Sequence, residues 1–127
     1  MNRQHDAVGE LSLLSSEQGG RMTPVRTGYR PTVGVHDNYQ TSVAIEFIGA
    51  DQLLPGESID ARVSFITPHV YPRCLWPARE LAVFEGTRKV GSFRVREVVN
   101  QSLVGNEQSF SATWSLPPEL TDRQNDA

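Results

Sequence analysis

The chain has 127 residues and a formal net charge of −3, and 38% of its residues are hydrophobic. This length and apolar content suit one domain with one modest core. No apolar run approaches the ~18 residues of a membrane helix, and the first residues lack the apolar core of a signal peptide, so we expect a cytoplasmic protein with no membrane partner. Residues 1–99 carry 11 basic and 11 acidic side chains, which argues against nucleic-acid binding through bulk charge.

Six stretches, taken in chain order, alternate apolar and polar residues in the way that strands with one buried face do. The clearest is residues 58–66, where Ile59, Ala61, Val63 and Phe65 alternate with polar side chains. The six expected strands span residues 8–14, 29–36, 41–48, 58–66, 81–84 and 90–99. Six short strands in an open sheet would leave long unpaired edges, and closure removes those edges. The sequence therefore predicts an all-β fold, a small six-stranded antiparallel β-barrel.

The barrel is expected to occupy residues 7–99, between a disordered N-terminus of residues 1–6 and a C-terminal extension of residues 100–127. Pro68, Pro72 and Pro77 predict that residues 67–79, the Pro-rich segment, run over the surface in an extended form. Within the extension, residues 109–116 alternate Phe110 and Trp114 with small polar residues, which is the pattern of an added strand. A disordered acidic tail is expected to follow it.

Residues 19–31 form the most distinctive connection in the chain. This 19–31 loop begins with two glycines, contains two prolines, and carries Arg21, Arg26 and Arg30 with no acidic residue. Glycine and proline indicate a defined connection rather than a strand, and arginine is a planar, always-charged donor suited to phosphate or carboxylate. The loop is therefore the first candidate binding surface. The alternative is that it is simply solvated.

The sequence carries no pattern typical of catalysis or metal binding. His5, His36 and His69 lie about thirty residues apart, so none has a second ligand at the spacing of a metal site. Cys74 stands next to an apolar pair and is more typical of a buried cysteine than of a nucleophile. No Gly-x-x-x-x-Gly-Lys-Ser/Thr loop is present, so we expect neither nucleotide binding nor GTP hydrolysis. We expect no enzyme, no cofactor and no metal.

An ordered set of motifs across residues 7–99 resembles the third domain of bacterial elongation factor Tu. The motifs are Gly19-Gly20-Arg21-Met22-Thr23-Pro24, Gly28-Tyr29-Arg30-Pro31, Leu54-Pro55-Gly56-Glu57, Pro68, and Glu85-Gly86-Thr87-Arg88-Lys89-Val90-Gly91. Each motif alone is weak, whereas their order and spacing are fairly specific. The resemblance implies the fold of that domain, a six-stranded antiparallel barrel.

The resemblance also implies contact with the T-stem backbone of aminoacyl-tRNA. In that family the contacts lie in the Gly-Gly-Arg loop, in the strand after Tyr-Arg-Pro, at a hairpin threonine and at the Glu-Gly turn. With the neighbouring basic residues, the RNA-binding candidates of this chain are Arg21, Arg26, Arg30, Thr41, Glu85, Gly86, Arg88 and Lys89. Met22 and Thr32 stand where the family usually has histidine and glutamine.

Two functions are compatible with these residues. The first is a non-catalytic protein-interaction module, for which the resemblance suggests a translation factor as the partner, with Trp76, Tyr71 and His69 as contact candidates. Trp76 has a second interpretation, as a cap on the open end of the barrel. The alternative function is weak binding of the tRNA backbone by the RNA-binding candidates. A variant of the first function is a regulatory mimic that occupies one of the ligands of the parent domain.

Overall fold

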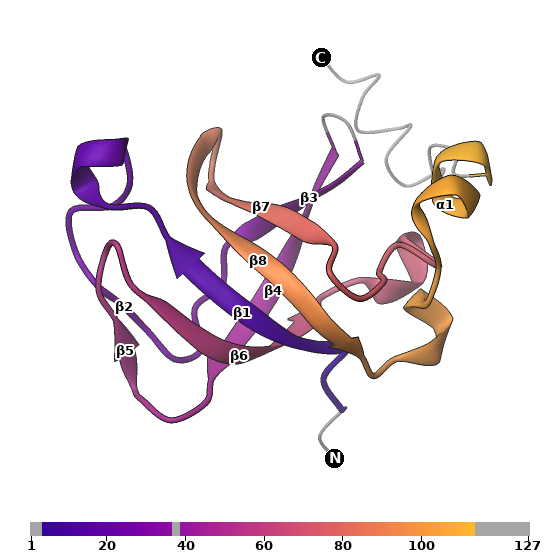
Figure 1. Cartoon of the computed structure of the whole chain (residues 1–127), viewed down its shortest axis with the longest axis horizontal. Helices are drawn as coiled ribbons and strands as arrows, with labels where there is room; N and C mark the ends of the chain where they lie inside the picture. The colour runs from indigo at the N-terminus through magenta and orange to yellow at the C-terminus, as the bar shows by residue number, and fades with distance from the viewer. Residues whose placement is uncertain (1–3, 37–38, 114–127) are drawn as a thin grey trace.

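A computed structural model describes residues 4–36 and 39–113, and it contains a closed antiparallel barrel of six strands (Figure 1). The order of the strands around the barrel is β1-β6-β4-β3-β7-β8. The strands are β1 (Ala7–Leu13), β3 (Thr32–His36), β4 (Tyr39–Phe47), β6 (Ser58–Phe65), β7 (Glu80–Glu85) and β8 (Arg88–Val98). The predicted small all-β barrel is therefore confirmed.

The core fills the barrel with side chains from alternating positions of each strand. In β6, Ala61, Val63 and Phe65 are buried while the residues between them are not, which is the period of two expected of a strand with one buried face. Strands β1 and β8 approach each other closely where they close the barrel. A Cβ atom at Gly9 would lie 2.1 Å from the carbonyl oxygen of Arg94, and one at Gly91 would lie 2.3 Å from that of Ser12. Only glycine fits this approach.

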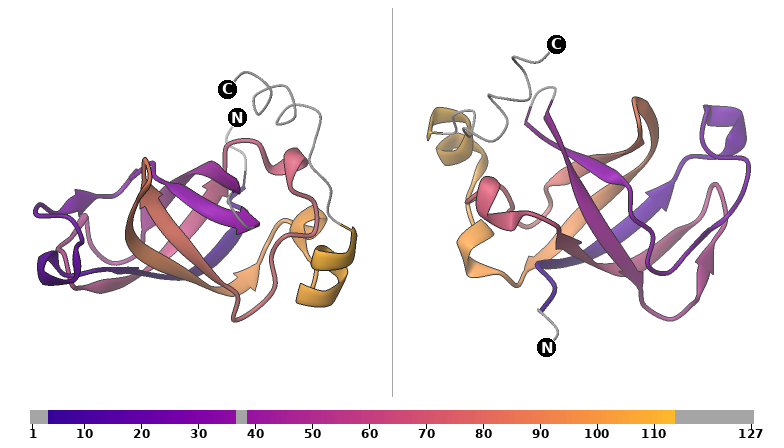
Figure 2. Two further views of the ribbon diagram at one scale, coloured as in Figure 1. Left: turned by 90° about the horizontal axis from the view of Figure 1, so that it is seen from above. Right: turned by 180° about the vertical axis from the view of Figure 1, so that it is seen from behind.

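The two ends of the barrel are covered by different segments, as Figures 1 and 2 show. One end carries the 3-10 helix η1 (Ser16–Gln18) and a two-stranded sheet of β2 (Val25–Arg26) and β5 (Gln52–Leu53). We call this the loop end and include in it the 19–31 loop and the turn between β7 and β8. The opposite end carries η2 (Pro68–Val70), η3 (Gln101–Leu103) and α1 (Glu107–Thr113), and we call it the helix end.

The Pro-rich segment at the helix end is partly core, which corrects the expectation of a surface path. Val70, Tyr71, Cys74 and Leu75 are buried. The C-terminal extension runs beside this segment, with Leu75 bridged in parallel to Val104. The Leu75 N–H donates to the Leu103 carbonyl at 2.8 Å, and the Gly105 N–H donates to the Leu75 carbonyl at 2.9 Å. The extension is therefore part of the folded domain up to at least this point.

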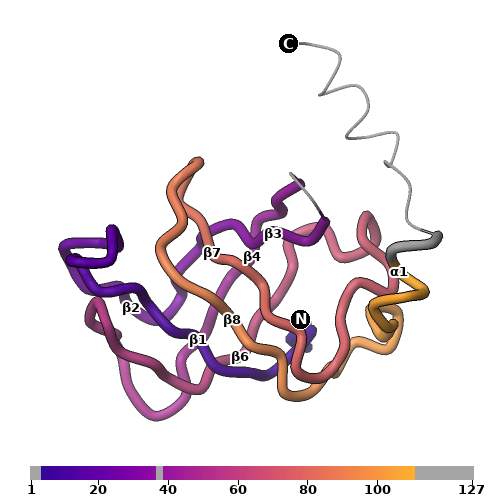
Figure 3. The backbone as a smooth tube through the Cα atoms, turned by 45° about the horizontal axis from the view of Figure 1, so that its top comes forward, coloured from indigo at the N-terminus to yellow at the C-terminus, as the bar shows by residue number. Residues whose placement is uncertain are grey.

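The added strand predicted for residues 109–116 is wrong over its described part, because α1 covers residues 107–113 (Figure 1), and Figure 3 shows the backbone coiling at the α1 label. Asn106 starts this helix, since its side-chain oxygen accepts from the Ser109 N–H at 2.7 Å and its carbonyl accepts from the Phe110 N–H at 2.9 Å. Trp114 and the acidic tail lie outside the described residues. No helix within the described ranges is long and apolar enough to cross a membrane.

The N-terminal boundary also differs from the prediction, because Asp6 was expected to be disordered and is fully buried. Its carboxylate accepts from the Phe65 N–H at 2.6 Å and from the side-chain amide of Asn100 at 2.8 Å. Its backbone donates to the Val63 carbonyl and accepts from the Val99 N–H. Because a buried carboxylate needs such partners, Asp6 ties the start of β1 to the chain that leaves β8.

Candidate functional site

Three side chains meet at the loop end around the carboxylate of Glu85, the last residue of β7. Both the Arg21 guanidinium and the Tyr29 hydroxyl donate to the same oxygen, Oε2 of Glu85. Arg21 also donates from Nε to the Thr23 carbonyl at 3.1 Å and from a terminal nitrogen to Thr23 Oγ1 at 2.9 Å. Its guanidinium lies 5.9 Å from the centre of the Tyr29 ring. Arg21 therefore joins the 19–31 loop to the end of a barrel strand.

The electrostatics of this cluster favour a neutral, closed arrangement. The Arg21 and Glu85 side chains are 24% and 33% exposed, so solvent screens their ion pair only in part. Burial, together with the hydrogen bond to Glu85, raises the pKa of the Tyr29 hydroxyl above its ordinary value. The hydroxyl therefore stays protonated and remains a donor to Glu85. The opposite charges of Arg21 and Glu85 cancel.

Arg88, at the start of β8, holds the other side of the same loop. Its Nε donates to the Gly19 carbonyl at 3.0 Å, and a terminal nitrogen donates to the Gly20 carbonyl. Gly19 ends η1 with a φ of +91°, a conformation that favours glycine. Arg21 and Arg88, two of the RNA-binding candidates, are thus both hydrogen-bonded to other groups of this chain.

The remaining RNA-binding candidates do not form one surface with these residues. Thr41 is 6% exposed and lies in phase with the buried Val43 of β4, so its side chain points into the barrel, which argues against the predicted contact role. Arg26, Arg30, Gly86 and Lys89 are exposed. Within the part of the chain that the structure describes, the side chains of Arg26, Arg30 and Lys89 make no hydrogen bond or ion pair.

The three protein-contact candidates lie at the helix end and differ in exposure. Tyr71 is 2% exposed, so it belongs to the core, which argues against its predicted contact role. Trp76 is half-buried and packs against the core, which supports its interpretation as a cap on the open end of the barrel. His69, in η2, is exposed. These residues therefore do not form a common exposed patch.

Sequence reasoning missed Arg79, the polar residue at the centre of the helix end. Its guanidinium donates to the Val35 carbonyl at 2.6 Å and to the Cys74 carbonyl. The guanidinium carbon lies 4.6 Å from the centre of the Trp76 ring and 5.3 Å from that of Phe110, within the range of cation–π attraction. Burial lowers the pKa of Arg79 from its ordinary value. No local sequence pattern could have identified this residue, because its partners come from β3, the Pro-rich segment and α1.

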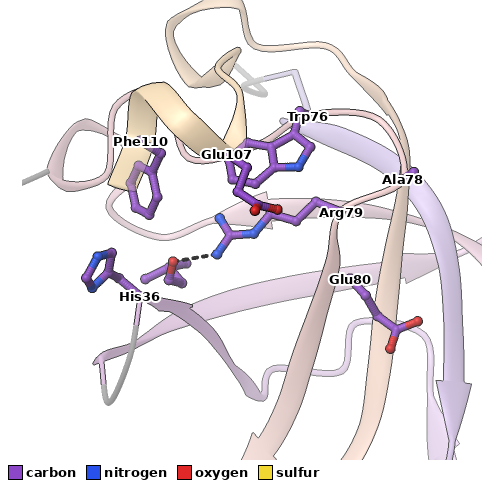
Figure 4. Close-up of a pocket in the computed structure, with 8 residues that line it drawn as sticks. His36, Trp76, Ala78, Arg79, Glu80, Glu107 and Phe110 are labelled. Carbon is purple, nitrogen blue, oxygen red and sulfur yellow. Dashed lines mark hydrogen bonds between the residues drawn. The ribbon is translucent and has the colours of Figure 1, made fainter. Parts of the chain in front are cut away.

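Arg79 borders a pocket of about 400 Å³ at the helix end (Figure 4). Aromatic rings line much of it, with the His36 and Phe110 rings 5.4 Å apart and the Trp76 and Phe110 rings 6.2 Å apart. The full lining consists of Val35, His36, Trp76, Ala78, Arg79, Glu80, Glu107 and Phe110. The accessible lining of the pocket is mainly polar, with Arg79, Glu80 and Glu107 as its charged groups.

The described part of the chain contains neither a reactive thiol nor a metal-binding cluster. Cys74 is fully buried, as predicted, and burial raises the pKa of its thiol to about 12, so the thiol is protonated at neutral pH and is a poor nucleophile. No group of three or more histidine, cysteine, aspartate or glutamate side chains that could hold a metal occurs among residues 4–36 and 39–113. No model of a known protein family matches the chain.

Proposed function

We propose that this chain is a non-catalytic interaction module of the elongation factor Tu third-domain type, and that its loop end docks a protein partner. The main support for this proposal is that the Met22 side chain is exposed on a loop held by hydrogen bonds. Met22 is 81% exposed, and it lies between two glycines held by Arg88 and a threonine held by Arg21. A large apolar side chain is thus displayed on a loop whose shape is fixed from both sides.

A fixed loop favours binding because little conformational entropy is lost when it docks. Methionine is a flexible, polarisable side chain that fills apolar pockets of irregular shape. Arg26 and Arg30 belong to the same loop, and both are exposed with no acidic residue in the loop. The complementary partner surface is an apolar pocket bordered by carboxylates. The motif resemblance supports a translation factor as the class of partner.

The structure gives less support to the alternative, binding of a tRNA backbone. A phosphate would have to compete with Glu85 for Arg21 and with two backbone carbonyls for Arg88. The cations left for phosphate are then Arg26, Arg30 and Lys89. Three phosphate contacts would give a slope of log affinity against log salt of about −2 to −3, which corresponds to weak and salt-sensitive binding.

The test is an affinity capture from the lysate of the source organism, with and without RNase. We expect a protein that stays bound after RNase treatment, is lost with Met22→Ser and is retained with Ile66→Ser. Ile66 is a matched control because it is an exposed apolar residue, 46% exposed, beyond the other end of the barrel. A protein captured equally by both variants would contradict docking through Met22. Captured tRNA that is lost with Arg26→Ala and Lys89→Ala would favour the alternative function.

A further inference from the structure

Two opposite charges, those of Arg79 and Glu107, line the helix-end pocket. Figure 4 shows the Arg79 guanidinium and the Glu107 carboxylate directed toward the same space, whereas the Glu80 carboxylate points away from it. Glu107 is close enough to Arg79 to act on it electrostatically. Nevertheless, among the described residues the Glu107 side chain forms no ion pair or hydrogen bond with Arg79 or with any other group. We call this an open pair, because the two charged groups line one pocket without forming an ion pair.

Arg79 is held firmly and still has donors to offer. A guanidinium carries five N–H groups, and the two hydrogen bonds of Arg79 go to the carbonyls of Val35 and Cys74. These bonds and the adjacent Trp76 ring fix the orientation of the guanidinium. The side chain therefore cannot swing toward Glu107 without leaving two carbonyls unsatisfied. A ligand carboxylate can bind the remaining N–H groups without that loss.

Glu107 is placed opposite by α1. The Phe110 side chain is 3% exposed and packs against the rings of His36 and Trp76, so it anchors the helix on the barrel. Glu107 lies three residues earlier, which places the two side chains on neighbouring positions of the helix surface. Glu107 is exposed and lines the pocket, on a helix with a buried anchor.

We propose that this pocket binds a free α-amino acid. The ligand carboxylate is bound by Arg79 and the ligand ammonium group by Glu107. A simple anion would be repelled by Glu107, and a simple cation by Arg79. A zwitterion complements both charges, and a volume of about 400 Å³ lies within the usual range for small-molecule sites. This proposal does not depend on the function proposed for the loop end.

The first experiment is a calorimetric titration of the full chain with L-leucine and L-phenylalanine. Concentrations should reach ~10 mM, above the dissociation constant of about 1 mM expected of so small a ligand. N-acetyl-L-leucine lacks the ammonium group and L-leucinamide lacks the carboxylate, so each should bind at least about tenfold more weakly than L-leucine. Absence of binding of both free amino acids at ~10 mM, or equal binding of the blocked forms, would overturn the proposal.

The second experiment compares two single-charge variants that leave the core intact. Glu107→Gln removes the ammonium partner and should weaken L-leucine binding by about tenfold or more. Glu80→Gln is the matched control, because Glu80 also lines the pocket but points away from Arg79, and it should change the affinity by less than about twofold. An unchanged affinity in Glu107→Gln with wild-type circular dichroism would refute the proposed orientation. If that variant fails to fold, the two blocked ligands decide the question on the wild-type chain.

Discussion

Leu103→Ala tests whether the C-terminal extension belongs to the folded domain. Leu103 is 0% exposed in η3, and its carbonyl accepts from the Leu75 N–H at 2.8 Å. Truncation of a fully buried leucine removes its apolar contacts and leaves a cavity, which costs about 2–5 kcal/mol of the free energy of unfolding. For a domain of this size, a loss of about 3 kcal/mol lowers Tm by roughly 10 °C.

The measurement is thermal and urea unfolding, followed by far-UV circular dichroism. Val104→Ala is a matched control, because the adjacent Val104 is 40% exposed and its truncation should change the free energy of unfolding by about 0.5 kcal/mol or less. A Tm for Leu103→Ala within about 2 °C of the wild type would refute the packing of residues 100–105 against the Pro-rich segment. Equal losses in the two variants would show that the effect is not specific to the buried position.

Three further predictions concern the loop end and the buried thiol. Glu85→Gln removes the charge that Arg21 and Tyr29 share, and urea titration should show a loss of about 1–2 kcal/mol, since the pair is partly exposed; no loss would contradict the closed cluster. The raised pKa of Tyr29 means that its contribution to stability is complete below the ordinary tyrosine pKa and falls as the pH rises toward the folded value. Unfolding above about pH 10 should therefore be less pH-dependent in Tyr29→Phe than in the wild type. Cys74, with its pKa raised to about 12, should react with a disulfide reagent only as fast as the chain opens, and rapid labelling of the native protein would contradict its burial.

The strands could be predicted from the sequence because their local pattern and their environment agree. In residues 58–65 every second side chain is apolar and faces the core, so the period of two is visible without knowledge of any partner strand. Strands β2 and β5 have two residues each, which is too short for a period to appear. Residues 109–113 show the alternation of a strand but form a helix, because Asn106 caps the first turn and Phe110 finds a buried position against Trp76. Tertiary contacts therefore determine the secondary structure of that segment.

The candidate site was less predictable because its groups come from distant parts of the chain. The pattern of β4 itself places Thr41 in phase with Val43 and therefore inward, whereas the motif resemblance suggested an outward contact. The local pattern was the better guide at that position. Arg21 and Glu85 are 64 residues apart, and Arg79 and Val35 are 44 residues apart. Their pairing depends on barrel closure, which a local pattern does not encode.

The two ends of the barrel use a similar pair of charges in opposite ways. At the loop end, Arg21 and the Tyr29 hydroxyl both donate to Glu85, so the pair is neutral, and the two further hydrogen bonds of Arg21 to Thr23 fix the loop. At the helix end, Arg79 binds two carbonyls and, among the described residues, forms no ion pair with Glu107, so both charges keep unfilled hydrogen-bonding capacity. The Arg21–Glu85 ion pair stabilises the conformation of the loop. By contrast, Arg79 and Glu107 can each form new hydrogen bonds with a ligand that bridges them, which makes binding favourable. It follows that charge removal at Glu85 should change stability more than ligand binding, and charge removal at Glu107 should change ligand binding more than stability.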